Sequence, residues 1–265
     1  MSGPRKPSAE SPVDTPRDRL DLPLVLAVAM LTAAPGIGAN PIGGHVTHGD
    51  ASITTQPGRV TVDQRSGKTV INWNGFSIET GEVTRFRQPN RRSIALNRVV
   101  TARPSRIAGR LEANGNVWLI NQNGVTIGPS GRVHTQGFLA TTTDIADGNF
   151  MDGRYHFDRP STNPNARVIN QGRISLGERG LGALVAPHAR NDGVIQGRAS
   201  TVVIAGTETF TVDLYGDGLI NFKIRSPVTR HPSPGGCGRP GREQRADPDR
   251  RWTGTDYRRC RRGDH

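Results

Sequence analysis

The sequence NQGRI, residues Asn170–Ile174, returns 21 residues later as NDGVI, residues Asn191–Ile195. In both copies an asparagine stands two places before a glycine, which favours a tight turn, and an isoleucine in a β-favouring segment follows. A turn that recurs at this distance is typical of a solenoid, in which each coil buries its apolar face against the next coil. We therefore interpret the repeat as one coil of a β-solenoid.

Short β-favouring runs extend this pattern from Asn40 to Ile224. Each run has 3 to 6 residues, is rich in Val, Ile and Thr, and is bounded by turn formers, so the sequence predicts many short strands and no helix. Alternate side chains of a strand share a face, so we expect Val125 and Ile127, and likewise Val202 and Ile204, to point into the solenoid. The runs are Arg59–Asp63, Thr69–Trp73, Phe76–Glu79, Ser93–Leu96, Asn116–Ile120, Val125–Ile127 and Ser200–Ala205.

Asparagine-glycine pairs supply candidate corners at Asn74-Gly75, Asn114-Gly115 and Asn123-Gly124. Glycine adopts positive φ without steric cost, and we expect all three pairs to use it. With coils of about 20 to 25 residues, the body should hold roughly eight coils. Its exposed strand edges need caps, for which Pro41–Ser52 and the carboxyl-terminal tail are the candidates, and Asp144–Asn165 is expected to leave the coils as an excursion.

The first 38 residues have the layout of a signal peptide. A polar segment with four basic residues precedes an apolar run at Leu22–Ala34, and the small residues Gly36, Gly38 and Ala39 follow. The apolar run is shorter than the roughly 20 residues that cross a bilayer. We predict cleavage after Gly38, within a window from residue 34 to residue 39.

The tail, residues 225–265, has a different composition from the body. The chain has 265 residues, a formal net charge of +12 and only 33% hydrophobic residues, which indicates a thin core. Half of the net charge falls in the tail, with eleven arginines and five acids, so the total does not predict a nucleic-acid partner. Cys237 and Cys260 also lie there, and the body therefore has no disulfide framework. The tail is either a disordered basic segment or the product of a frameshift.

A set of motifs in fixed order between Pro41 and Phe222 resembles the amino-terminal secretion domain of two-partner secretion exoproteins. This is the filamentous haemagglutinin, or haemagglutination activity domain, family, and the similarity is greatest to its haemophilus-type adhesins. The motifs are Pro41–Gly44, Val70–Ile78, Phe86–Pro89, Ala95–Val99, Arg106–Leu111, Val117–Val125, Asn149–Gly153 and Asp213–Ile220.

The family signature N-P-N-G corresponds here to Asn121, Gln122, Asn123 and Gly124, with glutamine in place of proline. Proline would fix φ at this position, whereas glutamine leaves φ free. We therefore expect the turn to form, but to be less rigid than with proline. A second signature, N-P-N-L, is matched loosely by Leu96–Val99, which adds Asn97 to the candidate residues without a role taken from other members. By this resemblance the four residues of the turn, together with Asn97, are candidates for recognition by a transporter.

The resemblance implies an all-β fold, a single-stranded right-handed parallel β-helix over residues 39–224 with an amino-terminal cap and small β excursions. It also implies a chain that crosses the periplasm of a Gram-negative bacterium unfolded, where an outer-membrane barrel transporter with periplasmic binding domains binds it. The chain would fold on emerging, as part of a secreted or surface-exposed adhesin that contacts glycans or proteins of host or neighbouring cells. The alternatives are the export domain of a contact-dependent inhibition toxin or haemolysin, and a β-helical carbohydrate-active enzyme.

The ionisable residues do not favour the enzyme alternative. The acids fall mainly at predicted turns or in the excursion, and we interpret them as solvated turn residues. No metal site or cofactor is predicted, because the excursion acids lack the spacing of a calcium loop and His45 and His48 point to opposite faces of a strand. The acids are Asp50, Asp63, Glu79, Glu82, Glu112, Asp144, Asp147, Asp152 and Asp158.

Overall fold

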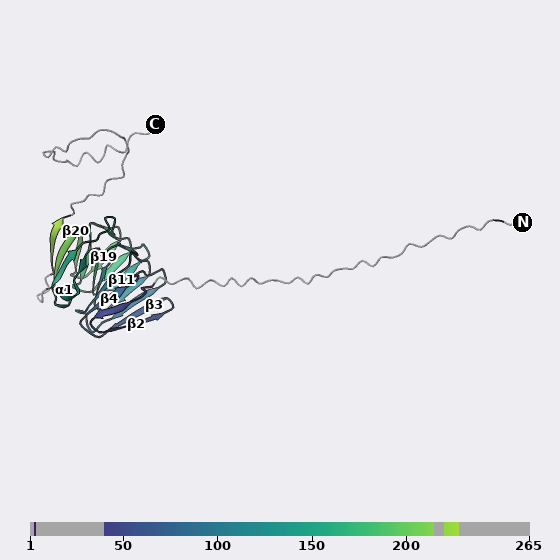
Figure 1. Ribbon diagram of the computed structural model, residues 1–265, viewed down its shortest axis with the longest axis horizontal. Helices are drawn as coiled ribbons and strands as arrows, with labels where there is room; N and C mark the ends of the chain where they lie inside the picture. Colours follow the sequence, from purple (N-terminus) through teal and green to yellow (C-terminus); the bar gives the residue numbers. More distant parts are fainter. Residues whose placement is uncertain (1–2, 4–39, 215–219, 228–265) are drawn as a thin grey trace, which may run out of the picture. The chain divides into compact units, whose positions relative to one another are not determined.

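The computed structural model describes Gly3, residues 40–214 and residues 220–227, the last stretch by its backbone only (Figure 1). Except for Gly3, the predicted signal peptide lies outside the described residues. The same holds for the predicted tail beyond residue 227, including both cysteines. The described residues therefore belong almost entirely to the body of the chain.

The body is a parallel β-helix with three faces. On each face, strands that lie 20 to 44 residues apart in the sequence pair side by side, so the chain winds through all three faces in turn. The first face holds β4 (Lys68–Trp73), β6 (Ile94–Val99), β9 (Asn116–Ile120), β12 (Gly137–Thr141), β17 (Leu181–Ala186) and the first half of β20 (Thr201–Leu214).

The second face holds β3 (Arg59–Gln64), β5 (Val83–Arg87), β8 (Arg110–Ala113), β11 (Arg132–Thr135), β16 (Arg173–Leu176) and β19 (Val194–Gly197). The third face holds β7 (Ser105–Ile107), β10 (Val125–Ile127), β15 (Arg167–Asn170) and β18 (His188–Asn191). The first two faces thus have six parallel rungs each in the described residues, fewer than the eight coils expected. The estimate was too high because the cap, the excursion and a final hairpin use residues without adding rungs.

The repeat that predicted the solenoid occupies two adjacent coils. Asn170 pairs with Asn191 between β15 and β18, and Ile174 pairs with Ile195 between β16 and β19. The Nδ2 group of Asn170 donates a hydrogen bond of 2.7 Å to Oδ1 of Asn191, so the two asparagines stack at one corner. The prediction that this repeat is one coil of a β-solenoid is confirmed.

Stacked aliphatic side chains fill the interior. Leu111, Val133 and Ile174 lie in register on three consecutive rungs and are at most 1% exposed. Val125 and Ile127 are also buried in this core, as predicted. Because every coil adds one more layer to these ladders, a chain with few large apolar residues still builds a continuous core.

Val202 and Ile204 lie on the strand face that was predicted to point into the solenoid, but they are not buried. Both lie in β20, and Ile204 pairs with Leu184, which belongs to the interior core. Val202 is nevertheless 45% exposed and Ile204 47% exposed. The first half of β20 is the last parallel rung of its face in the described residues, so these two side chains have a layer on one side only.

The amino-terminal end of the helix is capped as predicted for Pro41–Ser52. Strand β1 (His45–His48) runs antiparallel to β4, and β2 (Ala51–Gln56) runs antiparallel to β3. These two strands occupy the edges that the first rungs would otherwise leave unpaired, which protects them from pairing with another chain.

The predicted excursion is also present, but it contains a helix that the sequence did not predict. It consists of β13 (Asp144–Ile145), α1 (Asp147–Met151) and β14 (Tyr155–Arg159), and β14 pairs antiparallel with the second half of β20. Strand β21 (Ile220–Pro227) adds to the other side of β20. Helix α1 has five residues and is the only helix among the described residues, none of which forms a helix able to cross a membrane.

Only one of the three asparagine-glycine pairs uses the expected backbone. Gly124 has a φ of 106°, whereas Gly75 and Gly115 are not among the positive-φ glycines. At Gly115 the requirement is space, because a Cβ there would lie 2.6 Å from Oε1 of Gln88. The expectation of positive φ at all three glycines is therefore wrong for two of them.

Candidate functional site

The candidate signature forms one corner of the helix, between β9 and β10. Asn121 and Gly124 are buried, while Gln122 and Asn123 are half-buried. The N–H of Gly124 donates to the carbonyl of Asn121 over 3.0 Å, and the N–H of Asn123 donates to Oδ1 of Asn121 over 2.9 Å. The first asparagine thus closes the turn with both its main chain and its side chain.

The same asparagines hold the preceding coil. Nδ2 of Asn121 donates to the carbonyl of Arg103 and to Oγ of Ser105, each over 2.9 Å, and Nδ2 of Asn123 donates to the carbonyl of Thr101 over 2.9 Å. The turn therefore fixes residues 101–105, which carry the chain from β6 to β7. The sequence did not identify these partners, because most are main-chain groups and all lie about 16 to 22 positions away.

The following coil closes over the turn from the other side. A Cβ on Gly124 would lie 2.9 Å from the carbonyl oxygen of Arg167, so only glycine fits between the two coils with this backbone. Oγ of Ser161, in the loop after β14, donates to the carbonyl of Gln122. The turn is thus enclosed by its neighbours in the folded chain.

Asn97 does not join this turn. It lies in β6, is fully buried, and accepts a hydrogen bond of 2.9 Å from Nε1 of Trp73 while donating to the carbonyl of Ala95 over 3.1 Å. These contacts place it inside the helix as the polar partner of a buried tryptophan. The structure brings Asn121, Gln122, Asn123 and Gly124 together and leaves Asn97 at a separate position.

We expect Asn121→Ala to lower the free energy of unfolding by about 2 kcal/mol, because the N–H of Asn123 and the groups at Arg103 and Ser105 lose a buried partner. Chemical denaturation of the folded chain measures this change. Gln122→Ala is the matched control, since no hydrogen bond of its side chain is found in the described part of the chain. Equal losses in the two variants would contradict the structural role given to Asn121.

A cluster of charged side chains links the excursion to the β-helix. Nε of Arg98 lies 2.8 Å from Oδ1 of Asp144, and its Nη2 lies 2.7 Å from Oδ1 of Asp147. Nδ1 of His48 contacts the same Asp147 carboxylate over 3.3 Å. Burial would lower the pKa of Arg98, but the two carboxylates raise it, so the guanidinium stays charged.

This cluster corrects the interpretation of the acids as solvated turn residues. The side chains of Asp144 and Asp147 are 17% and 26% exposed and bind an arginine that is itself 13% exposed. Glu82 is also buried and accepts the N–H of Glu79 over 2.8 Å. Asp50 fits the original view better, because it pairs with Arg65 with both side chains 58% exposed.

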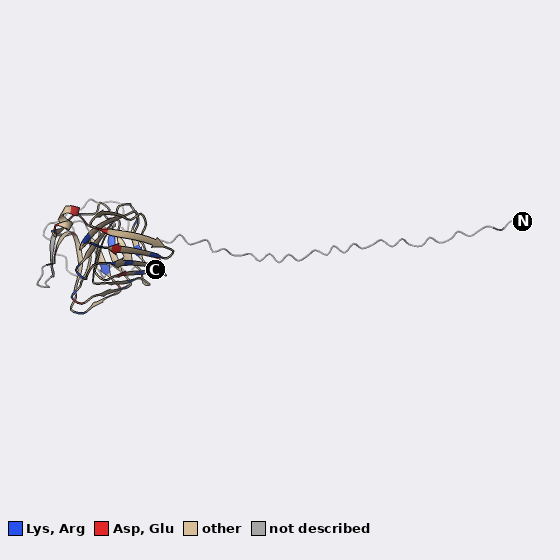
Figure 2. Cartoon of the chain, turned by 90° about the horizontal axis from the view of Figure 1, so that it is seen from below, with Lys and Arg blue, Asp and Glu red and all other residues tan. Residues whose placement is uncertain are grey.

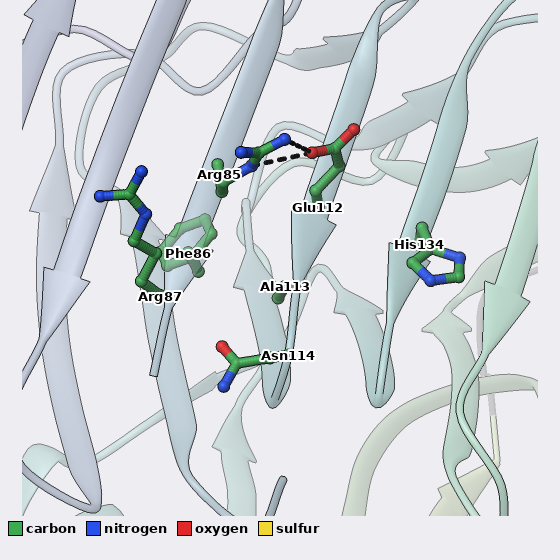
Figure 3. Close-up of a pocket in the computed structure, with 7 residues that line it drawn as sticks. All are labelled: Arg85, Phe86, Arg87, Glu112, Ala113, Asn114 and His134. Carbon is green, nitrogen blue, oxygen red and sulfur yellow. Dashed lines mark hydrogen bonds and ion pairs between the residues drawn. The ribbon is translucent and has the colours of Figure 1, made fainter. Parts of the chain in front are cut away.

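A shallow groove on the second face has the other notable arrangement of ionisable side chains (Figure 3). Arg85 of β5 points toward Glu112 of β8, with its Nη2 2.5 Å from the carboxylate, and His134 of β11 follows on the next strand. The glutamate is thus neutralised by its neighbour. Among the described residues, no group of three His, Cys, Asp or Glu side chains is placed to hold a metal ion.

The capped parallel β-helix, with its asparagine corner and short antiparallel excursion, places the chain in the β-solenoid class of folds. The family described as TPS secretion domain, for two-partner secretion, matches residues 37–228. The chain belongs to this family. Family exoproteins are secreted through the outer membrane of Gram-negative bacteria, and the fold and family are those of a secretion domain.

Relatives from Haemophilus influenzae agree with this assignment. Two heme/hemopexin-binding proteins are 39% identical over 105 residues and 36% identical over 118 residues, which is 40% and 44% of this chain and 12% of each relative. The crystal structure of the HMW1 secretion domain superposes with a TM-score of 0.64 at 30% identity, over 72% of this chain and 50% of that chain. The chain therefore spans a small part of the curated relatives.

Proposed function

We propose that residues 39–224 target an exoprotein for export, and that an outer-membrane barrel transporter with periplasmic binding domains recognises them. The observation that carries the proposal is the family match over nearly the whole β-helix, with the signature turn at Asn121–Gly124. The unfolded chain would be read in the periplasm, and the β-helix would form after it emerges at the cell surface.

The enclosure of the turn supports recognition before folding. In the folded chain the side-chain amides of Asn121 and Asn123 are bonded to the preceding coil, and Gly124 lies against the following coil. A partner that reads these residues would therefore meet them more easily in an extended chain. The absence of cysteines from the body is compatible with this order of events, because no disulfide could trap the fold in the periplasm.

The test is secretion with and without the transporter. We expect cells that co-express the full chain with its cognate transporter to release it into the medium, and cells with an empty vector to retain it. Immunoblots of medium and periplasm measure the distribution, with a periplasmic enzyme as the lysis control. Equal release in the two strains would contradict the proposal.

For the exoprotein that carries the domain we propose an adhesin that contacts glycans or proteins on host or neighbouring cells. The relatives named heme/hemopexin-binding protein favour a second candidate, an exoprotein that binds haem or haemopexin. Binding of immobilised haemopexin by the complete exoprotein distinguishes the two. The export domain of a toxin would give the same result as that of an adhesin in the secretion test. A toxin is distinguished by an assay for the killing of neighbouring cells.

A further inference from the structure

A row of arginines runs along the outside of the second face. Arg110 of β8, Arg132 of β11 and Arg173 of β16 are paired in register on three consecutive rungs, and all three are exposed. Adjacent rungs of a sheet are about 4.8 Å apart, so the three side chains leave the face at that spacing. We call these three residues the arginine ladder. Their strands are direct neighbours in the sheet of this face. Figure 1 labels the middle strand, β11, and Figure 2 colours the lysines and arginines of the described chain blue.

The ladder has little compensating charge within the described chain. Arg110 lies 3.8 Å from Glu112, but that carboxylate already pairs with Arg85 over 2.5 Å. Arg132 donates to the main-chain carbonyls of Pro129 and Gly131. Arg173 donates to the neutral side chain of Gln196 over 3.1 Å. None of the ion pairs found among the described residues includes either of these last two arginines.

The surroundings of the ladder are basic as well. On the strands of the second face, Arg59, Arg85 and Arg87 add three positive charges outside the ladder, and the acids are Asp63 and Glu112. His134 lies beside the ladder on β11 and lines the groove with Arg85 and Arg87 (Figure 3). The face thus carries six arginines against two acids.

Such a row is unfavourable for the isolated chain. Like charges directly opposite each other on neighbouring strands destabilise a sheet. Here the repulsion is repeated at two successive pairs, Arg110 with Arg132 and Arg132 with Arg173. An external polyanion with charges along a line would remove the repulsion and gain charge-assisted hydrogen bonds, which guanidinium groups form in a two-pronged geometry.

The shape and chemistry of the face select the kind of polyanion. A membrane-binding surface needs apolar side chains that enter the bilayer, and single-stranded nucleic acid needs aromatic rings on which its bases stack. The aromatic residue of the groove, Phe86, is 1% exposed. Among the described residues of this face, the only large apolar side chain that is strongly exposed is Val194, beyond the ladder on β19. The face therefore presents a line of positive charge, without exposed aromatic rings for base stacking and without an apolar patch at the ladder for insertion into a bilayer.

We propose that the arginine ladder binds a linear acidic polysaccharide, with its sulfate or carboxylate groups along Arg110, Arg132 and Arg173. This site goes beyond export, because the ladder exists only when three coils have stacked. It would act on the folded domain after secretion, and its failure would leave the export proposal untouched.

The test compares two triple variants of the full chain, which share the same tail. The ladder variant carries Arg110→Gln, Arg132→Gln and Arg173→Gln. The control variant carries Arg91→Gln, Arg92→Gln and Arg106→Gln, three exposed arginines that lie outside the second face. Both variants lose three positive charges, so a difference between them reports position and not net charge.

Binding to immobilised dextran sulfate and to polygalacturonate, with dextran as the neutral polymer, is measured over a range of salt. We expect the ladder variant to lose at least about tenfold in affinity for the charged polymer that the native chain prefers, and the control variant less than about threefold. The salt dependence should weaken mainly in the ladder variant, since it has fewer contacts that release counterions. Preference for dextran sulfate would identify sulfate as the anion, and preference for polygalacturonate would identify carboxylate.

Three results would overturn the proposal. They are equal losses in the two variants, no binding by the native chain to either charged polymer, and equally tight, ladder-dependent binding to single-stranded DNA. Circular dichroism and denaturation of both variants establish that a loss does not come from unfolding. Secretion of the ladder variant, measured in parallel, should equal that of the native chain.

Discussion

Trp118→Ala should lower the free energy of unfolding by about 3–5 kcal/mol, the largest loss that we expect from a single substitution. Trp118 lies in β9 and is 1% exposed. Its ring lies 4.8 Å from that of Tyr155 and 5.7 Å from that of Phe150, measured between centroids. The substitution leaves a large cavity between the β-helix and the excursion. Denaturant unfolding measures the loss.

The segments that Trp118→Ala destabilises test the packing more sharply than the size of the loss in stability. Phe150 and Tyr155 belong to the excursion, so we expect hydrogen exchange to accelerate first in α1 and β14, with less change in the interior ladders of β11 and β16. Trp118→Phe keeps an aromatic ring at the site and is the control, with a smaller loss. Uniform acceleration along the chain would contradict the packing of Trp118 against the excursion.

Arg98→Ala should cost about 2–4 kcal/mol, because it leaves the carboxylates of Asp144 and Asp147 without their buried partner. The guanidinium also donates to the carbonyl of Ile145 over 2.8 Å, so the variant removes a main-chain contact of the excursion. Thermal or chemical denaturation measures the effect. A loss of this size is larger than that of ordinary surface ion pairs.

Arg65→Ala is the matched control for Arg98→Ala. Arg65 forms a comparable two-pronged pair with Asp50, at 2.7 and 2.9 Å, but the side chains of both residues are more than half exposed. Water replaces such a partner at little cost, so we expect a much smaller loss of stability than for Arg98→Ala. Similar losses in the two variants would show that the Arg98 cluster does not anchor the excursion.

The fold could be predicted because each repeat is a short sequence motif whose residue types favour a turn followed by a strand. The NxG turns at Asn170 and Asn191 fixed the coil length, and strand pairing then placed Ile174 over Ile195. The exposure of Val202 and Ile204 could not be predicted, because burial in a solenoid depends on a neighbouring coil and not on the strand itself. The helix at Asp147–Met151 was missed for a similar reason, since its stability comes from packing of Phe150 on distant aromatic rings.

The candidate site was predictable in part. The four residues of the signature turn were identified together, and the structure places them in one corner. Asn97 was grouped with them by a loose motif, yet its bond to Trp73 gives it a separate place in the interior. Arg98, the partner of Asp144 and Asp147, lies 46 or more positions away, where sequence spacing carries no information. The arginine ladder becomes visible only once the coils are in register, because its members are unevenly spaced along the chain.

The central claim is that a partner transporter reads the chain at Asn121–Gly124 before the helix forms. The most direct measurement is the fraction of chain secreted in the presence of the transporter by Asn121→Ala and by Arg98→Ala, alongside the native chain. Arg98→Ala should be the less stable of the two after folding, yet it leaves the turn intact. The claim predicts strongly reduced secretion of Asn121→Ala and near-native secretion of Arg98→Ala. Secretion that instead falls with stability, lowest for Arg98→Ala, would contradict it.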